Sequence, residues 1–154
     1  MARFDKGLNT EKVLQALNAV LEFELAGVVR YTHYSLMVFG HARIPIIAWM
    51  RSQATESLNH AQATGEHITT LGGHPSLKIG KLLETEQHDI DAILCESLEH
   101  ERGGLALYYG LLELVKDKSV WLEEYVREQI LQEESHIAEV EKMLRAPGDL
   151  VPAR

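Results

Sequence analysis

The segment ELAGVVRYTHY at residues 24–34 and the segment ERGGLALYYGL at residues 101–111 decide the fold, because they repeat one unusual pattern. Aligning them places Glu24 on Glu101, and each glutamate is followed at the same spacing by a tyrosine. Both glutamates stand where the apolar stripe of a helix would carry leucine. The repeat therefore predicts two helices that each carry a carboxylate on an apolar face.

A second pair of segments repeats almost in step with the first. ESLNHAQATGEHI, which starts at Glu56, aligns with QEESHIAEVEKML, which starts at Gln132, and this alignment places His60 on His136. The chain is thus predicted to consist of two similar helical hairpins. Each hairpin carries a carboxylate and an imidazole in mid-helix.

Composition limits the class of protein. A chain of 154 residues with 45% apolar content fits a single domain over residues 1–154. Acidic residues outnumber basic ones by 23 to 15, so metal cations are expected partners and nucleic acid is not. Cys95 is the only cysteine, which excludes an intrachain disulfide and a cysteine zinc cluster. Neither a signal peptide nor a membrane-spanning stretch is evident, so a cytoplasmic protein is expected.

Local signals predict an all-α chain with four long helices. Thr10 suits the N-cap of the first helix, and Pro45 suits the first turn of the second. The pair Gly72 and Gly73 would end the second helix, and Ser119 would cap the fourth. The predicted helices cover about residues 10–39, 45–71, 85–116 and 119–145.

The connector between the second and third helices is long. Residues 74–84, HPSLKIGKLLE, exceed what a turn between adjacent antiparallel helices needs. Such a connector can cross from one end of a bundle to the other, so we predict a four-helix bundle of up-down-down-up order. The sequence shows no strand alternation, glycine-rich phosphate loop or nucleophile elbow.

The chemistry lies in the polar residues on the apolar stripes. Glu24 lies between Leu21 and Val28, and Glu101 has the same place in the third helix. A buried carboxylate without a partner costs several kcal/mol or takes up a proton, so each glutamate requires a compensating charge or donor.

Imidazoles on the other two helices can complete such a site. Glu133 and His136 lie three residues apart on one face of the fourth helix, and His60 lies on the matching face of the second, four residues after Glu56. Four carboxylates would neutralise two divalent cations, and two imidazoles add neutral ligands. The electrostatics therefore favour a dinuclear centre over a single ion.

Over roughly residues 10–145 these segments resemble the ferritin-like superfamily of di-iron carboxylate proteins, and most of all the bacterioferritins. The resemblance implies a ferritin-like bundle with two iron ions per chain, although the same oxygen and nitrogen ligands accept manganese or zinc. It implies that Glu24 and Glu101 are terminal ligands and that Glu133 bridges both metals. His60 and His136 would supply one nitrogen ligand to each ion.

The second helix departs from the family pattern. Ser57 stands where the glutamate of a Glu-x-x-His motif is expected, and the nearest carboxylate, Glu56, is four residues before His60. We expect Glu56 to be the sixth metal ligand, either re-aimed by a local π-bulge or in an asymmetric centre that holds one metal weakly. The alternative is a solvated side chain on the rim of the helix.

The resemblance also bears on haem and assembly. Bacterioferritins bind haem through a methionine two residues before the histidine ligand, and this chain has Leu58 there, so haem is not expected unless Met50 or another side chain replaces it. The C-terminal sequence RAPGDLVPAR leaves little room for the fifth helix of the family's 24-subunit shell. Additional apolar residues such as Val29 and Phe39 favour a homo-oligomer, at least a dimer.

The function implied is oxidation of Fe(II) by dioxygen or peroxide, a ferroxidase activity that serves iron storage or detoxification. One alternative is a di-iron oxygenase or oxidase with an organic substrate, which a substrate-sized apolar pocket beside the metals would favour. Another is a metal-free helical module that binds a partner. Tyr31 and Tyr108 are either core residues or hydrogen-bond donors to a ligand carboxylate. His67 and His100 are candidates for accessory metal contacts.

Overall fold

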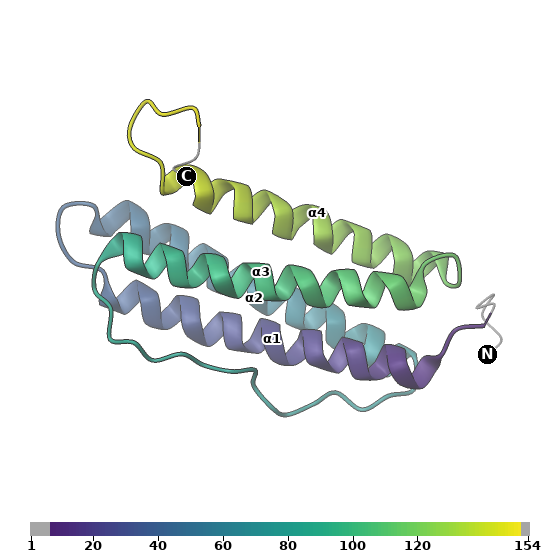
Figure 1. Ribbon diagram of the computed structural model, residues 1–154. Coiled ribbons are helices and arrows are strands. Elements are labelled where there is room, and N and C mark those ends of the chain that lie inside the picture. Colours follow the sequence, from purple (N-terminus) through teal and green to yellow (C-terminus); the bar gives the residue numbers. More distant parts are fainter. Residues whose placement is uncertain (1–6, 152–154) are drawn as a thin grey trace.

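Four helices make up the computed structural model, which describes residues 7–151. Figure 1 shows them running side by side, with α1 and α4 in one direction and α2 and α3 in the other. The predicted all-α bundle, its up-down-down-up order and its long crossover are confirmed. The bounds are Thr10–Met37 for α1, Arg43–Thr70 for α2, Ile90–Val115 for α3 and Val120–Met143 for α4.

Two helix starts differ from the sequence prediction. Asn9, not Thr10, caps α1, because its side chain accepts a hydrogen bond of 3.1 Å from the backbone N–H of Lys12. α3 starts at Ile90 and not near residue 85, because Asp89 accepts a hydrogen bond from the N–H of Ala92 and thereby forms the N-cap. The crossover is correspondingly longer than predicted.

The first hairpin turn also differs from the prediction. The first helix was predicted to end near residue 39 and the second to start at residue 45. In the structure α1 ends at Met37 and α2 begins at Arg43. α1 ends two residues before the predicted end because the backbone of Val38 is extended, with a φ of −84° and a ψ of 127°, and Gly40 in the following turn has a φ of +92°. Pro45 remains within the first turn of α2, as expected.

The crossover lies along α1 for most of its length (Figure 1). The N–H of Gly80 donates a hydrogen bond of 2.8 Å to the carbonyl oxygen of Glu22. Ser76 donates from its backbone N–H to Asn18 and from its hydroxyl to the Glu22 carboxylate, at 2.7 and 2.6 Å. These contacts with the middle of α1 fix the path of the connector. Within residues 7–151, no helix is long and apolar enough to span a membrane.

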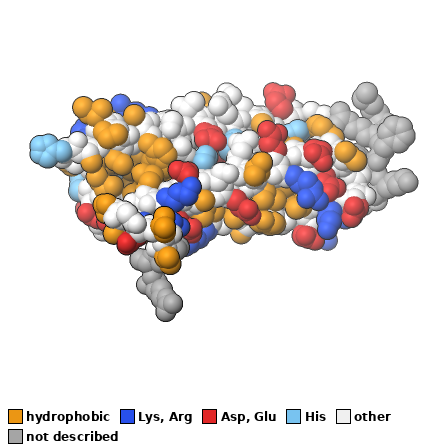
Figure 2. Space-filling view, turned by 90° about the horizontal axis from the view of Figure 1, so that it is seen from above, with side chains coloured by type: hydrophobic (Ala, Val, Ile, Leu, Met, Phe, Trp, Pro, Cys, Tyr) orange, Lys and Arg blue, Asp and Glu red, His pale blue; other side chains and the backbone are white. Residues whose placement is uncertain are grey.

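Apolar clusters occupy both ends of the bundle. One contains Leu17, Ile68 and Leu122 near the start of α1, and others near the α1–α2 turn contain Met50 and Leu94. The view from above shows hydrophobic side chains gathering toward the α1–α2 turn (Figure 2). Burial at both ends holds the helices in register and leaves a polar layer in the middle.

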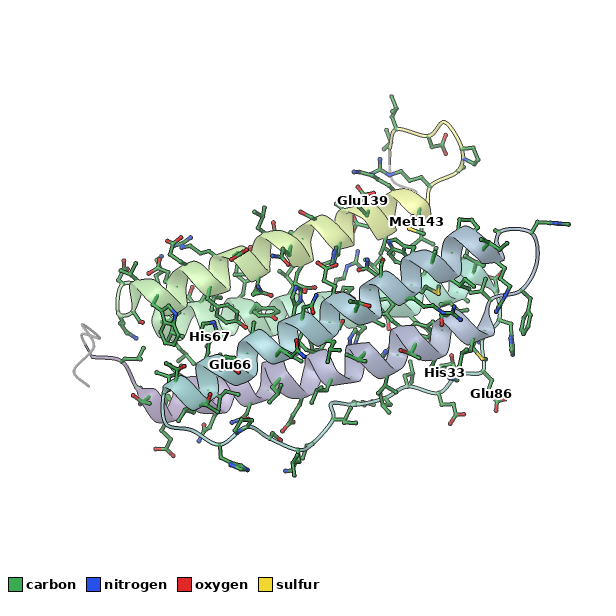
Figure 3. The ribbon with its side chains drawn as sticks, turned by 180° about the vertical axis from the view of Figure 1, so that it is seen from behind. His33, Glu66, His67, Glu86, Glu139 and Met143 are labelled. Carbon is green, nitrogen blue, oxygen red and sulfur yellow. The ribbon has the colours of Figure 1, made fainter. Side chains whose placement is uncertain are left out.

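The helix pairs do not approach each other equally. Cα atoms lie within 8 Å of one another between α1 and α2, between α3 and α4, and between α1 and α3. Between α2 and α4 the described residues show no such approach. Figure 3 shows long side chains in the space between α2 and α4. This side of the bundle has room for imidazoles.

A close approach of α1 and α3 leads to a stability prediction. A Cβ atom at Gly104 would lie 2.3 Å from the ring of Phe23, whereas one at Gly103 would have no heavy atom within 4 Å. We expect Gly104→Ala to lower the free energy of unfolding by about 1–3 kcal/mol relative to Gly103→Ala, because the Phe23 ring must move. Gly103→Ala should stabilise the exposed helix by about 0.5–1 kcal/mol. Urea unfolding measures both, and equal stabilities would contradict this packing.

Candidate metal centre

Each helix contributes a polar side chain to the middle layer of the bundle. Glu24 comes from α1, His60 from α2, Glu101 from α3 and Glu133 from α4, and all four are buried. Their exposed fractions are between 2% and 6%, so three carboxylates lie out of contact with bulk water. His136, one turn after Glu133, is half-buried.

These side chains form two groups with metal-ligand geometry. Glu24, His60 and Glu133 form one group, and Glu101, Glu133 and His136 form the other. Within each group one ligand atom from every residue lies within 4.8 Å of the others. Because Glu133 belongs to both groups, a carboxylate there can bridge two ions. The structure thus brings together five of the six predicted ligands.

The shared carboxylate is only partly satisfied. The Nδ1 atom of His60 lies 3.4 Å from Oε1 of Glu24 and 3.4 Å from Oε1 of Glu133. The second oxygen of Glu133, Oε2, is buried and has no hydrogen-bond partner. A buried, unpartnered carboxylate oxygen is costly, and a cation is the partner that would remove this cost.

Two tyrosines hold the terminal carboxylates from across the bundle. The Tyr108 hydroxyl donates a hydrogen bond of 2.6 Å to Glu24, and the Tyr31 hydroxyl donates a short hydrogen bond to Glu101. Burial raises the pKa of both tyrosines well above the ordinary value, and the neighbouring carboxylates raise it further. Both hydroxyls therefore stay protonated as donors. Of the two roles considered for Tyr31 and Tyr108, the structure shows both, since each ring is buried and each hydroxyl donates to a buried carboxylate.

Protons compensate part of the charge of the buried carboxylates. Burial raises the pKa of Glu24, and it raises that of Glu101 well above its usual range, where the hydrogen bond and charge of Glu133 add to the effect. Burial lowers the pKa of His60, but hydrogen bonds with Glu133 and Glu24 outweigh it and raise the value to about 11. His60 therefore carries a positive charge at neutral pH.

Glu56 lies outside both groups. Its carboxylate meets the outer nitrogens of the imidazoles, with Oε2 lying 3.0 Å from Nε2 of His136 and Oε1 lying 3.9 Å from Nε2 of His60. α2 is α-helical along its whole length, so the suggested π-bulge is absent. Ligation by Glu56 remains a prediction.

Gln132 is a polar neighbour of the centre that was not predicted from the sequence. The Oε1 atom of Gln132 lies 2.8 Å from Nε2 of His60 and accepts the hydrogen bond of that nitrogen. The signal was present, since Gln132 is aligned with Glu56 in the repeat. Its importance depends on a contact between α4 and α2, which the pattern of one helix does not reveal.

The other candidate histidines have different environments. The ring of His67 packs against Tyr125 and Trp121, and that of His100 stacks on Phe23 at a centroid distance of 4.1 Å. Burial, followed by the charge of Arg30, lowers the pKa of His100 to about 3, so His100 is neutral. Neither histidine belongs to the two ligand groups.

Comparison with known proteins identifies the class. The family model of the ferritin-like domain matches residues 14–147, so the chain belongs to the ferritin-like family. No curated protein matches.

Solved structures agree with the fold. A ferritin-like di-iron-carboxylate protein from Bacillus anthracis superposes with a TM-score of 0.83 at 22% identity, covering 88% of this chain and 97% of that one. The dodecameric thioferritin of Bacteroides fragilis, a bacterioferritin-related protein, gives 0.80 at 22%, covering 89% and 86%. The bacterioferritin of Desulfovibrio desulfuricans, whose di-iron site was observed in several catalytic states, gives 0.77 at 25%, covering 88% and 79%.

Proposed function

We propose that this protein binds two metal ions between its four helices and oxidises Fe(II) to Fe(III), for iron storage or detoxification. The observation that carries the proposal is the buried Glu133, which belongs to two ligand groups and has an oxygen without a partner. The family membership and the di-iron site of the D. desulfuricans relative support it.

The donor set fits two divalent cations. Glu24 and Glu101 would each bind one ion at one side of the centre, and Glu133 would bind both. His60 and His136 would add one nitrogen ligand to each ion. Three carboxylates in a dry site repel one another, and two cations remove that repulsion as well as the cost of burial.

Iron is the substrate that this ligand set favours for redox chemistry. Oxygen ligands stabilise the harder Fe(III) product, whereas zinc bound at the same site has no redox chemistry and manganese would compete for the ligands. Each Fe(II) loses one electron. Two of them supply the two electrons that cleave the O–O bond of hydrogen peroxide, which takes up two protons and leaves as water. Dioxygen accepts the same two electrons and two protons to become peroxide.

The surrounding side chains hold this centre rather than react. Tyr31 and Tyr108 fix the orientation of the terminal carboxylates, and the apolar clusters on either side keep bulk water out. Ligands held before the ions arrive lose little conformational freedom on binding. The absence of methionine at Leu58 is the reason that we propose no haem for this chain.

Exposed apolar side chains on α1, in the α1–α2 turn and on the crossover support a homo-oligomer, at least a dimer. Val29, Phe39 and Leu77 are 40%, 63% and 96% exposed, and Leu82 and Leu83 line a pocket of about 350 Å³ beside α1. Large exposed apolar surfaces favour association. The B. fragilis relative assembles as a dodecamer, which supports a closed assembly here.

Two alternatives use the same residues differently. A pocket of about 470 Å³ next to Phe23 and His100 contains none of the predicted ligands, so it does not favour an oxygenase with an organic substrate. A metal-free module is consistent with the hydrogen-bonded His60, because that imidazolium already compensates Glu24 and Glu133. Metal removal distinguishes this module from a metalloprotein.

We expect the wild-type protein to bind two Fe(II) per chain under anaerobic conditions and to produce Fe(III) rapidly when peroxide or oxygen is added. Glu133→Ala and His136→Ala should slow oxidation by at least about 100-fold, beyond the effect usual for a residue that only orients a ligand. Stopped-flow absorbance of Fe(III) measures the rate.

Glu139→Ala is the matched control for these variants, because Glu139 lies on the same helix, is 61% exposed in its side chain and pairs with Lys142 (Figure 3). It should oxidise iron like the wild type. Wild-type rates in Glu133→Ala would rule out the assigned centre.

Chelation should lower the melting temperature. Metal bound only by the folded state stabilises it by about 2.7 kcal/mol at 100 times the dissociation constant, which corresponds to roughly 5–10 °C for a domain of this size. Calorimetry of the wild type with metal and with chelator measures the difference, and Glu133→Ala should show little of it. An identical melt of the wild type in both conditions would favour the metal-free module.

A further inference from the structure

The outer nitrogens of the two histidines have partners in a reciprocal arrangement. Gln132 on α4 accepts the hydrogen bond of His60 on α2 at 2.8 Å, and Glu56 on α2 meets Nε2 of His136 on α4 at 3.0 Å. Each acceptor lies four residues before the histidine of its own helix. The two contacts therefore cross the space between α2 and α4 in opposite directions. Both have the same spacing of four residues between the acceptor and the histidine of its helix.

This reciprocity makes Glu56 the counterpart of Gln132 rather than of Glu133. In α4 the residue after Gln132 is Glu133, the shared carboxylate, whereas in α2 the residue after Glu56 is Ser57. Exposure agrees, since the side chain of Glu56 is 33% exposed and that of Glu133 is 3% exposed. Thus α4 supplies a carboxylate, Glu133, at the bridging position, and α2 has Ser57 at the corresponding position.

We propose that Glu56 and Gln132 are positioning residues that orient the two imidazoles, and that Glu56 is not a metal ligand. This inference rests on the proposed dinuclear centre. A ring nitrogen that donates its proton to an outer acceptor fixes the tautomer, so the other nitrogen, Nδ1, offers its lone pair to the metal. In His60, Nδ1 already faces Glu24 and Glu133, as this role requires.

The proposal gives the centre a defined composition and an asymmetry. Three carboxylates and two imidazoles bind two divalent ions, so the loaded centre retains one positive charge. The Glu56 carboxylate lies 3.0 Å from Nε2 of His136 and 3.9 Å from Nε2 of His60, so its closer partner is His136, whereas the nearest acceptor of His60 is the neutral amide of Gln132 at 2.8 Å. Because an outer carboxylate makes an imidazole a stronger ligand, the ion bound by His136 should be held more tightly.

Cobalt(II) titration separates the two roles. The wild type should bind two ions, and Glu56→Gln should also bind two with an unchanged visible Co(II) spectrum, because glutamine keeps the acceptor and the ligand set stays the same. Glu56→Ala and Gln132→Ala should each weaken one of the two ions by about 10- to 100-fold. Glu133→Gln should lose at least one ion and change the spectrum. Glu66→Gln, an exposed substitution on α2 (Figure 3), is the control.

Three results would overturn the proposed roles of Glu56 and Gln132. If Glu56→Gln loses an ion and alters the Co(II) spectrum as Glu133→Gln does, Glu56 is a ligand and the inference is wrong. If Glu56→Ala and Gln132→Ala bind both ions like the wild type, neither residue has a positioning role. A wild-type protein that binds fewer than two ions would instead remove the dinuclear centre itself, and the inference with it.

Discussion

Three carboxylates are buried in the middle of a helical bundle, and their burial constrains the rest of this structure. The side chains of these carboxylates, Glu24, Glu101 and Glu133, are shielded from bulk water. The charge of each must be compensated by a proton, a hydrogen-bond donor or a cation. Tyrosine hydroxyls and the imidazolium of His60 supply donors to these carboxylates. These partners leave one oxygen of Glu133 unsatisfied, and two cations would complete the arrangement. Stability and metal binding are therefore linked at one site.

The packing explains why the site forms between these helices. Apolar clusters at both ends hold the register, and the small Gly104 allows α1 and α3 to approach, which brings their glutamates within reach of the tyrosine on the opposite helix. α2 and α4 remain farther apart. Their separation accommodates two imidazoles and the outer acceptors Glu56 and Gln132. The half-exposed part of the centre accordingly lies on this side.

Much of this arrangement could be predicted from the sequence, because helical periodicity reports which face of a helix a residue occupies. Glu24 and Glu101 interrupt apolar stripes, and that position predicted their burial. The role of Gln132 could not be predicted in this way, since it depends on the distance between two helices that are not neighbours in sequence. The start of α3 at Ile90 was missed for a local reason: Glu86 has a φ of 55°, which no continuous helix tolerates.

The central claim is that Glu133 bridges two metal ions at the middle of the bundle. Crystals of the wild-type protein grown anaerobically with Fe(II) would test it by anomalous diffraction at the iron edge. The account predicts two iron peaks, one bound by Glu24 and His60 and the other by Glu101 and His136, with Glu133 bound to both. Iron found only on surface carboxylates, with no iron bound to Glu133, would contradict it.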